Sequence, residues 1–231
     1  MFVGNIYRKL LRSFYSLRNA LFIKHQNFNL LTNCWNKSKL KTNKPWQDSD
    51  FLVVDLEMSS LDVNAGEILS IGWVAIQSGR VKLETAEHHI IHSNQGVGQS
   101  ATIHQLRDCE VDQGLTITDI SERFLKVSTN KVLVFHHAYL DMAFLNKASK
   151  AIYGAPLLLM VADTLILEKD KLVRQKGHIS QGELRLAACR ERYNLPLYPA
   201  HNALMDAIAT SELFIAIATY KGSETALKEL L

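Results

Sequence analysis

A pair of carboxylates closes an apolar segment that is typical of a buried strand. Asp55 and Glu57 flank Leu56 after the run Phe51-Leu-Val-Val. Because side chains alternate along a strand, residues i and i+2 lie on the same side, and both carboxylates are expected to face one point. Charges at the edge of an apolar strand are costly unless a counter-charge neutralises them. The pair therefore predicts a cation site, although ordinary surface acids explain the two residues equally well when taken alone.

Two further acids lie in the first turns of predicted helices. Asp141 follows His136-His-Ala-Tyr-Leu, and Asp206 follows His201-Asn-Ala-Leu-Met. For either residue alone, an acid that complements the helix dipole is the simpler explanation. In α/β sheets, however, sites form where strand ends meet helix starts, and all four acids belong to such places. Four converging carboxylates would repel one another unless divalent cations lie among them, and Mg²⁺ or Mn²⁺ are the hard ions that prefer oxygen ligands.

The elements that must position these acids follow from hydrophobic patterning. Short apolar or alternating segments predict five strands, at 51–55, 67–77, 81–92, 131–135 and 157–162. Helical patterns and capping residues predict helices near 121–127, 138–152, after Asp163-Thr164, 180–192 and 202–220. Three β elements followed by alternating β and α elements predict a mixed sheet flanked by helices, which is a three-layer α/β domain.

Composition agrees with a globular protein of one domain plus an extension. The chain has 231 residues, of which 47% are apolar and 21% are charged. Its apolar runs stay well below the ~20 residues of a membrane-spanning helix, so no transmembrane segment is expected. Cys34, Cys109 and Cys189 are far apart and odd in number, which argues against a disulfide framework or a zinc finger. We therefore expect a reducing compartment and a cytoplasmic location.

The first 47 residues differ sharply in charge from the rest. Residues 1–47 hold nine Lys or Arg and no acid, so the remaining 26 − 9 = 17 basic and 23 acidic groups give the body a net charge of −6. Apolar residues at steps of three and four form a helical stripe: Ile6, Leu10, Phe14, Leu17 and Leu21. This basic amphipathic helix could dock on its own domain, a protein partner, anionic lipid or nucleic acid, or act as an organellar transit peptide. Residues 33–50 read as a linker, which divides the chain into an extension, 1–47, and a domain, 48–231.

The acids, taken together, resemble a known family. Asp55-Leu-Glu57-Met-Ser-Ser-Leu61 resembles the first exonuclease motif of the DEDD superfamily, and the segment around Asp141 resembles the second. His201-x4-Asp206 resembles the third motif of the His-containing DEDDh subgroup. The strongest similarity is to DnaQ-like proofreading exonucleases, such as the epsilon subunit of DNA polymerase III, over about residues 51–221. The Asp-Leu-Glu-Met segment is also similar to oligoribonuclease.

The resemblance implies a ribonuclease H-like fold and removal of nucleotides from a 3′ end with two Mg²⁺ or Mn²⁺ ions. It implies that Asp55 touches both ions, that Glu57 and Asp206 complete the first, and that Asp141 supports the second. His201 would be the general base, a role that suits imidazole because it titrates near neutral pH. Without the neighbouring Asp206, His201 would read as an ordinary polar loop residue.

Residues expected to touch substrate depart from the family pattern. Met58 stands where proofreading enzymes commonly have Thr or Ser, and His137 stands where the second motif often has Asn. Met58 and Leu61 would stack on bases, and His104 resembles a substrate-side histidine. The two histidines that precede Asp141, His136 and His137, could equally be packed in the core or contact substrate. These departures affect the expected affinity and substrate range more than the chemistry.

The sequence leaves the substrate open. A 3′–5′ exonuclease on single-stranded or frayed DNA, replicative or repair-related, is the leading hypothesis, and a 3′ exoribonuclease is the alternative, because nothing in the chain reports on recognition of the 2′-hydroxyl. A non-catalytic module that binds nucleic acid or a protein is a different class. Four acids around a polyanion argue against a pure binder. A polymerase or another protein is a further possible partner, through the basic extension.

Overall fold

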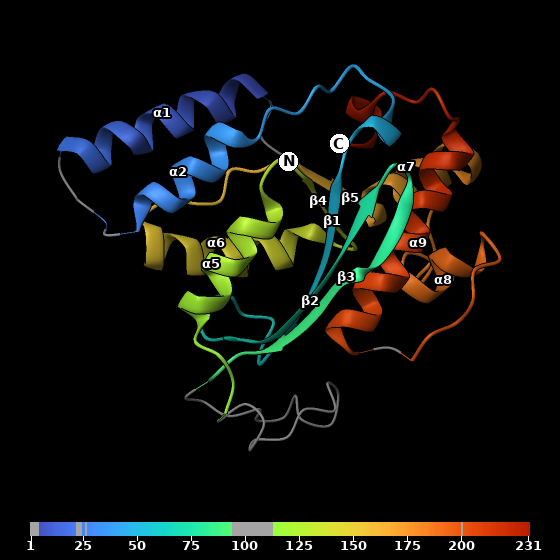
Figure 1. The fold of residues 1–231 in the computed structure, drawn as a ribbon. Helices are drawn as coiled ribbons and strands as arrows, with labels where there is room; N and C mark the ends of the chain where they lie inside the picture. The colour runs from blue at the N-terminus through green and yellow to red at the C-terminus, as the bar shows by residue number, and fades with distance from the viewer. Residues whose placement is uncertain (1–4, 22–24, 26, 94–112, 200) are drawn as a thin grey trace.

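The computed structural model describes residues 5–21, 25, 27–93, 113–199 and 201–231. A five-stranded sheet runs through the body in the order β3-β2-β1-β4-β5 (Figure 1). β1 pairs antiparallel with β2 and parallel with β4, while β2–β3 is antiparallel and β4–β5 is parallel. The strands are β1 (Phe51–Met58), β2 (Ile68–Gln77), β3 (Arg80–Ile90), β4 (Val132–Phe135) and β5 (Val161–Asp163). The expected mixed sheet is confirmed.

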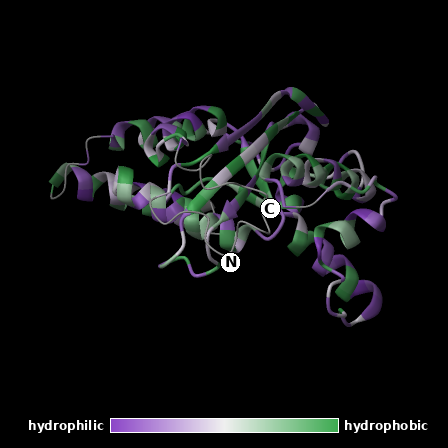
Figure 2. Ribbon diagram, turned by 90° about the horizontal axis from the view of Figure 1, so that it is seen from below, coloured by the Kyte–Doolittle hydropathy of each residue, from purple (hydrophilic) through white to green (hydrophobic). Residues whose placement is uncertain are grey.

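Helices cover both faces of the sheet and complete three layers (Figure 1). One face packs against α2 (Phe28–Lys37), α5 (Ile117–Ser128) and α6 (Ala138–Tyr153). The other packs against α7 (Thr164–Lys176), α8 (Leu186–Glu191), α9 (Ala203–Lys221) and the short 3₁₀ helices Trp46–Asp48 and Leu227–Leu230. Hydrophobic and hydrophilic residues alternate along the flanking helices, as a one-sided contact with a sheet requires (Figure 2).

β1 supplies residues to both cores. Leu52, Val54 and Leu56 pack on the α5–α6 side, whereas Phe51 and Val53 pack on the α9 side. Asp55 and Glu57 continue the second series, because strand side chains alternate. The strand thus aims both carboxylates toward the layer that contains α9.

α9 is the core helix of that layer. Its 19 residues are long and apolar enough to cross a membrane, by length and composition only, and half of the relevant window is buried in the protein. Its buried side chains, among them Leu213, Phe214 and Ile217, pack with the strands on one side of the sheet. This packing explains the apolar composition of α9, and we interpret it as a helix of the domain core.

The prediction of a linker over residues 33–50 is wrong in its first part, because α2 extends to Lys37. α2 places Leu31, Cys34 and Trp35 in the same core cluster as β1 and α6. The Trp35 indole N–H also donates to the Leu157 carbonyl. Apolar residues at positions 28, 31, 34 and 35 give α2 a buried stripe, which the polar residues between them conceal in a reading by composition. Trp46, near the end of the expected linker, is buried against the opposite core.

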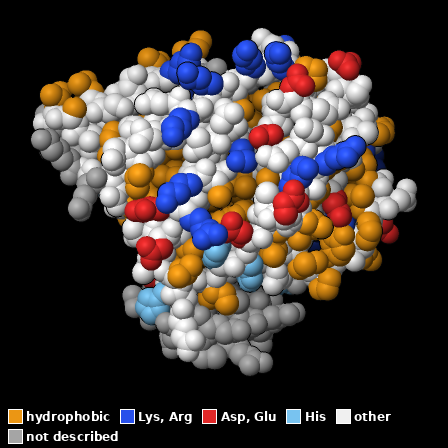
Figure 3. Space-filling model, in the orientation of Figure 1, with side chains coloured by type: hydrophobic (Ala, Val, Ile, Leu, Met, Phe, Trp, Pro, Cys, Tyr) orange, Lys and Arg blue, Asp and Glu red, His pale blue; other side chains and the backbone are white. Residues whose placement is uncertain are grey.

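α1 (Asn5–Leu21) is helical as expected, but the stripe that marks it faces outward. Six large apolar side chains of α1 are 57–79% exposed: Ile6, Tyr7, Leu10, Phe14, Leu17 and Leu21. Basic side chains face the body instead. Arg12 donates to the carbonyls of Trp35 (3.2 Å) and Leu158 (2.7 Å), and Arg18 donates to the carbonyl of Gly154. Figure 3 shows the hydrophobic side chains along the outer margin over α1.

Two predicted elements are shorter than expected. The fifth strand spans only Val161–Asp163, although Leu157 and Leu159 before it are buried. The helix predicted from Ser180 begins at Leu186. The Ser180 N–H does donate to Glu183 Oε2 (2.9 Å), so half of the expected capping box forms, but it closes a turn.

Candidate functional site

Three carboxylates from two layers converge beside the end of β1. Asp55 and Glu57 come from β1 and Asp206 from the first turn of α9, and one oxygen of each lies within 4.8 Å of the others. Asp206 is about 150 positions from Asp55 and Glu57 in the chain, so only the tertiary fold brings it to them. Carboxylate oxygens at this spacing are a donor set that suits Mg²⁺ or Mn²⁺.

A glycine that the sequence analysis missed allows this convergence. Gly72 of β2 is paired with Asp55, and the start of α9 lies directly over it. A Cβ atom at Gly72 would lie 2.3 Å from the Leu204 nitrogen and 2.4 Å from the Ala203 carbonyl carbon. The first turn of α9 therefore needs a glycine beneath it to bring Asp206 next to Asp55. A glycine inside an otherwise apolar strand was the available signal.

Asp141 reaches the same region from the opposite layer. Its side chain, in the first turn of α6, is buried, and the backbone N–H groups of Leu56 and of Asp141 itself lie close enough to the carboxyl to lower its pKa against the larger effect of burial. The pairing of β1 with β4 ends at Val53. Leu56 therefore lies in the part of β1 that is not paired with β4. Among neighbouring charges, that of Asp141 raises the pKa of Asp55 most, although Asp141 lies outside the group of three. Asp141 is therefore placed beside the cluster of Asp55, Glu57 and Asp206.

Burial raises the pKa of every acid at this site, and repulsion from other carboxylates adds to it for Asp55, Glu57 and Asp141. Loss of solvent is the largest cause for each of them. Repulsion from Asp141 and Asp206 adds to it and keeps the pKa of Asp55 well above its usual range. The pKa of Glu57 is raised to about 7 and that of Asp141 to about 8. Together the raised values identify a site that bound cations would stabilise.

His201 lies at the entrance to α9, as expected for a residue that can act over the acids. It is exposed and adopts a left-handed backbone conformation (φ 68°). Its backbone N–H donates to Asp206 Oδ2 (2.8 Å), and its ring is close enough to lower the pKa of Asp206. Asn202 then caps α9 by accepting from the Met205 N–H.

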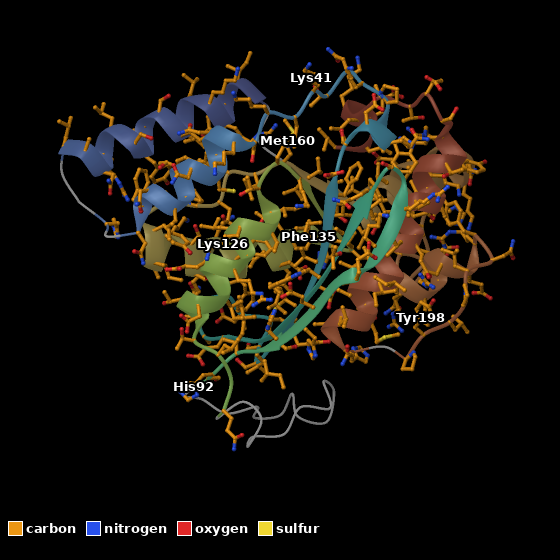
Figure 4. The ribbon with its side chains drawn as sticks, in the orientation of Figure 1. Lys41, His92, Lys126, Phe135, Met160 and Tyr198 are labelled. Carbon is orange, nitrogen blue, oxygen red and sulfur yellow. The ribbon has the colours of Figure 1, made fainter. Side chains whose placement is uncertain are left out.

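A buried arginine, also missed by the sequence analysis, anchors the segment before His201. Arg190 of α8 donates to the Pro196 carbonyl (2.7 Å) and to Glu212 of α9 (2.7 Å), and also to the carbonyl of Ala209. Its guanidinium lies 4.7 Å from the ring centre of Tyr198, which is labelled in Figure 4. The segment before His201 is thereby tied to the same helix that carries Asp206.

The two adjacent histidines before Asp141 have different surroundings. Both ring nitrogens of His136 have protein partners, Thr164 Oγ1 at 2.8 Å and the Leu184 carbonyl at 2.9 Å, and burial lowers its pKa. These contacts favour the packed alternative for His136. His137 is exposed, in a left-handed conformation (φ 79°), and its ring lines a groove beside α6. It stays a candidate for contact with substrate.

Asp163 is a helix cap, as expected, and it caps two helices. Its carboxylate accepts from the Leu165 N–H at the start of α7 (2.9 Å). It also accepts from the N–H groups of His137 (3.0 Å) and Ala138 (2.9 Å), where α6 begins. Asp163 therefore fixes the start of the helix that carries Asp141.

The other residues predicted to contact substrate are Met58, Leu61 and His104. Met58 ends β1 next to a β-bulge and packs at the edge of the core. Leu61 is 78% exposed in the loop that follows. Leu61 is therefore open to solvent, whereas Met58 is half-buried. His104 lies outside the described residues.

Comparison with known proteins agrees with this geometry. The profile of the exonuclease family RNase_T matches residues 52–214, which is most of the chain. DNA polymerase III PolC-type from Thermotoga petrophila is 27% identical over 177 residues, which are 76% of this chain but only 12% of that protein. The DNA polymerase III subunit epsilon of Aquifex aeolicus is 25% identical over 186 residues, covering 77% of this chain and 85% of that one.

A similar fold occurs among solved structures. The zinc-bound complex of E. coli exonuclease I with single-stranded DNA has a TM-score of 0.62 at 14% identity, over 74% of this chain and 41% of that one. At this identity the likeness concerns the fold, and it confirms the expected ribonuclease H-like architecture.

Proposed function

Since the chain belongs to the RNase_T family of DnaQ-like exonucleases, which are phosphodiester hydrolases, we propose that it removes nucleotides from the 3′ end of single-stranded or frayed DNA. The observation that carries this proposal is the convergence of Asp55, Glu57 and Asp206 within 4.8 Å, next to His201. A module that only bound nucleic acid would not need buried acids beside a polyanion. The raised pKa values show how costly that arrangement is without cations.

Asp55, Glu57 and Asp206 would hold one divalent cation, and Asp55 with Asp141 a second. Two such ions supply Lewis-acid stabilisation of the charge that develops on the phosphate as the ester bond breaks. Asp55 is suited to serve both positions. It is close to Glu57 and Asp206, and the charge of Asp141 raises its pKa. The backbone N–H of Leu56 lies close to the Asp141 carboxyl and favours its ionised form.

His201 would accept the proton of the attacking water. Its exposure allows the ring to turn over the acids, while its backbone bond to Asp206 keeps it near them. Arg190 and Asn202 hold the segments on either side of His201 to α8 and α9. A backbone held at both sides, with an exposed ring between them, suits proton transfer to solvent.

An exposed 3′ end suits this site better than a base-paired one. Met58 and Leu61 lie at the end of β1 and in the next loop, where they could stack on unpaired bases. RNA remains the second candidate substrate, because the Asp-Leu-Glu-Met segment of β1 is similar to oligoribonuclease. DNA is favoured because the sequence relatives include DNA polymerase III PolC-type and the DNA polymerase III subunit epsilon.

One assay tests the proposal and ranks the substrates. The full chain is incubated with 5′-labelled single-stranded DNA, duplex DNA or RNA of one sequence, with Mg²⁺, Mn²⁺ or chelator. We expect stepwise shortening from the 3′ end, fastest on single-stranded DNA and absent with chelator. Shortening from the 5′ end, or the same rate with chelator, would contradict the proposal, and faster shortening of RNA would favour the second candidate.

The outward apolar face of α1 supports binding to a protein partner, and a polymerase is the candidate. Side chains such as Ile6, Leu10 and Phe14 would be covered in such a complex. Chemical crosslinking of the full chain, compared with a Leu10→Ser/Phe14→Ser variant, tests this role. Disappearance of a crosslinked partner in the variant is expected, and an unchanged pattern would contradict it.

A further inference from the structure

A pocket lined by five basic residues lies between the extension and the body. It has a volume of about 300 Å³ and is lined by Arg8, Lys9, Arg12, Lys39 and Lys131, together with Ser38, Leu40, Leu159 and Met160. The described residues that line it include no Asp or Glu. Figure 3 shows Lys and Arg side chains gathered along the top, and Figure 4 places Met160 just below that edge.

Several positively charged side chains lie close together around this pocket. The pKa of Arg12 is lowered by burial and then by the nearby charge of Arg8, which means that its ionised form is disfavoured there. Arg12 and Lys131 donate hydrogen bonds to main-chain carbonyls, which do not cancel their charge. An anion in the pocket would relieve this repulsion.

The pocket and the acids lie at opposite ends of the same strands. Lys131 directly precedes β4, whereas Asp55 is level with the residue that follows β4, His136. Five residues of strand separate the two levels, which is about 16 Å at ~3.3 Å per residue. A ligand that occupies both ends must therefore be an extended chain.

A groove runs along the outer edge of β5, from the basic pocket toward the carboxyl ends of the strands, although none of the four acids lines it. It has a volume of about 1070 Å³, and His137, Tyr139 and Asp163 line it near the carboxyl ends of the strands. Arg8 lines its other end and also lines the basic pocket. Lys169, Arg174 and Lys221 add positive charge along it, and Asp170 and Glu229 add negative charge. Tyr139 is 77% exposed and offers a face on which a base can stack.

We propose that the basic pocket binds backbone phosphates of a single nucleic-acid strand whose 3′ end occupies the acidic site. The strand would leave the acids past His137, follow the β5 edge and place its upstream phosphates among Arg12, Lys39 and Lys131. This inference rests on the proposed exonuclease function and adds a second binding region to it. It also gives the basic extension a role that depends on its docked position.

The test compares two lysines that lie two residues apart. Lys39 lines the pocket and Lys41 does not, and both are exposed. Lys39→Glu and its matched control Lys41→Glu are placed in the full chain, each in an Asp55→Ala background that prevents cleavage. Binding of 5′-labelled oligo(dT) of 16 and of 3 nucleotides is measured by fluorescence anisotropy as a function of salt. A Lys131→Gln variant serves as a second pocket variant.

We expect Lys39→Glu and Lys131→Gln to weaken binding of the 16-mer and to reduce its salt slope by about 0.7 for each phosphate that is no longer neutralised. Binding of the 3-mer, and both oligonucleotides on Lys41→Glu, should be unchanged. Equal effects of Lys39→Glu and Lys41→Glu on the 16-mer would overturn the proposal. The proposal would also be overturned if phosphatidylserine vesicles competed for the pocket more strongly than oligo(dT) does. That result would assign the pocket to lipid headgroups.

Hydrolysis of the 3-mer by the chain with intact Asp55 is measured in parallel. If the 3-mer is cleaved but the pocket variants bind the 16-mer normally, the pocket proposal fails and the exonuclease proposal stands. If neither the 3-mer nor the 16-mer is cleaved, the exonuclease proposal fails, whatever the pocket variants show.

Discussion

The two ends of the central sheet carry opposite charge, and they are built in different ways. At the carboxyl end of β1, carboxylates project from a buried strand and from the first turns of two helices, and the backbone N–H of His201 donates to Asp206. At the amino end of β4, cations on α1 and on the segment after α2 surround a pocket. The first end depends on the core of the domain, and the second depends on how an extension is docked to it.

This difference separates chemistry from affinity. The acids are costly to assemble, as their raised pKa values show, and that cost suits a site that must hold cations and polarise a phosphate. The basic pocket lies about 16 Å further along the strands, so we infer that it contributes to binding of the strand and not to cleavage of the reacting bond. Changes at the acidic end should therefore reduce turnover, and changes at the basic end should reduce affinity.

Removal of Asp55 should have the largest effect, because we propose that its carboxylate serves both cations. Asp55→Ala is expected to reduce hydrolysis below detection while the fold is retained. In metal-free buffer its melting temperature should equal or exceed that of the wild type, because repulsion among the acids is relieved. Glu84→Ala, which removes an exposed acid of β3, is the matched control. Turnover of Asp55→Ala with intact metal dependence would remove the assigned site.

Truncation separates the two helices of the extension. A domain that began at residue 48 would survive deletion of residues 1–46, but Leu31 and Trp35 of α2 are buried in the core. Each buried side chain of this size contributes about 1.5–3 kcal/mol. Deletion of 1–46 should abolish cooperative thermal unfolding, whereas deletion of 1–21 should leave a folded hydrolase with weaker binding of long substrates at low salt. A cooperative transition near the wild-type temperature after the longer deletion would show that α2 is dispensable.

Replacement of His201 should reduce turnover and leave the cations in place. General-base catalysis typically contributes about 10²–10⁴-fold, so His201→Ala should lower kcat by roughly that range with nearly unchanged metal affinity. The acidic limb of the pH–rate profile should also disappear, because a neutral imidazole is no longer required. The measurement is kcat against pH at saturating Mg²⁺.

The two adjacent histidines before Asp141, His136 and His137, serve as controls for His201. His137→Ala should raise KM more than it lowers kcat, if its exposed ring contacts substrate. His136→Ala should mainly lower thermal stability, because it removes the bonds to Thr164 and Leu184. Near wild-type kcat and an unaltered acidic limb in His201→Ala would exclude His201 from the mechanism.

Gly72→Ala should disturb the acidic end alone. The added methyl group would overlap the backbone of Ala203 and Leu204, so the start of α9 must shift and carry Asp206 with it. Overpacking of this kind costs about 1–3 kcal/mol, and kcat should fall with it. Gly177→Ala is the control, since it has open space around it and only backbone strain to bear (φ +75°). Equal kcat in the two variants would show that Gly72 does not position Asp206.

The pH dependence of stability should report the repulsion among the acids. A carboxyl whose pKa is higher in the folded than in the unfolded chain binds its proton more tightly when folded, so the free energy of unfolding falls as pH rises. For Glu57 and Asp141 this window runs from their ordinary values near ~4 up to about 7 and 8. The metal-free protein should therefore melt at a lower temperature at pH 8 than at pH 5.5, by at least roughly 2 °C.

Saturating Mg²⁺ should flatten this dependence, because bound cations favour the ionised carboxylates. Asp141→Asn, which cannot ionise, should show a weaker dependence than the wild type. A metal-free melting temperature that rises from pH 5.5 to pH 8 would contradict the raised pKa values.

Local signals in the chain were sufficient to predict the elements that carry the acids. The apolar run before Asp55 became β1, the segment around Asp141 became α6, and the apolar helix after His201 became α9. Alternation along β1 also predicted correctly that Asp55 and Glu57 face one point, because a strand fixes the direction of each side chain. The order of the three motifs was sufficient to indicate the family.

How those elements meet depends on contacts between segments that are far apart in the chain. Nothing local shows that α9 crosses β2 at Gly72, or that Arg190 anchors the segment before His201. The stripe of α1 predicted a helix but not which face would dock. Periodicity reports that two faces differ, and the docked face depends on the partners that the rest of the chain supplies, here the carbonyls of Trp35 and Leu158 that accept from Arg12.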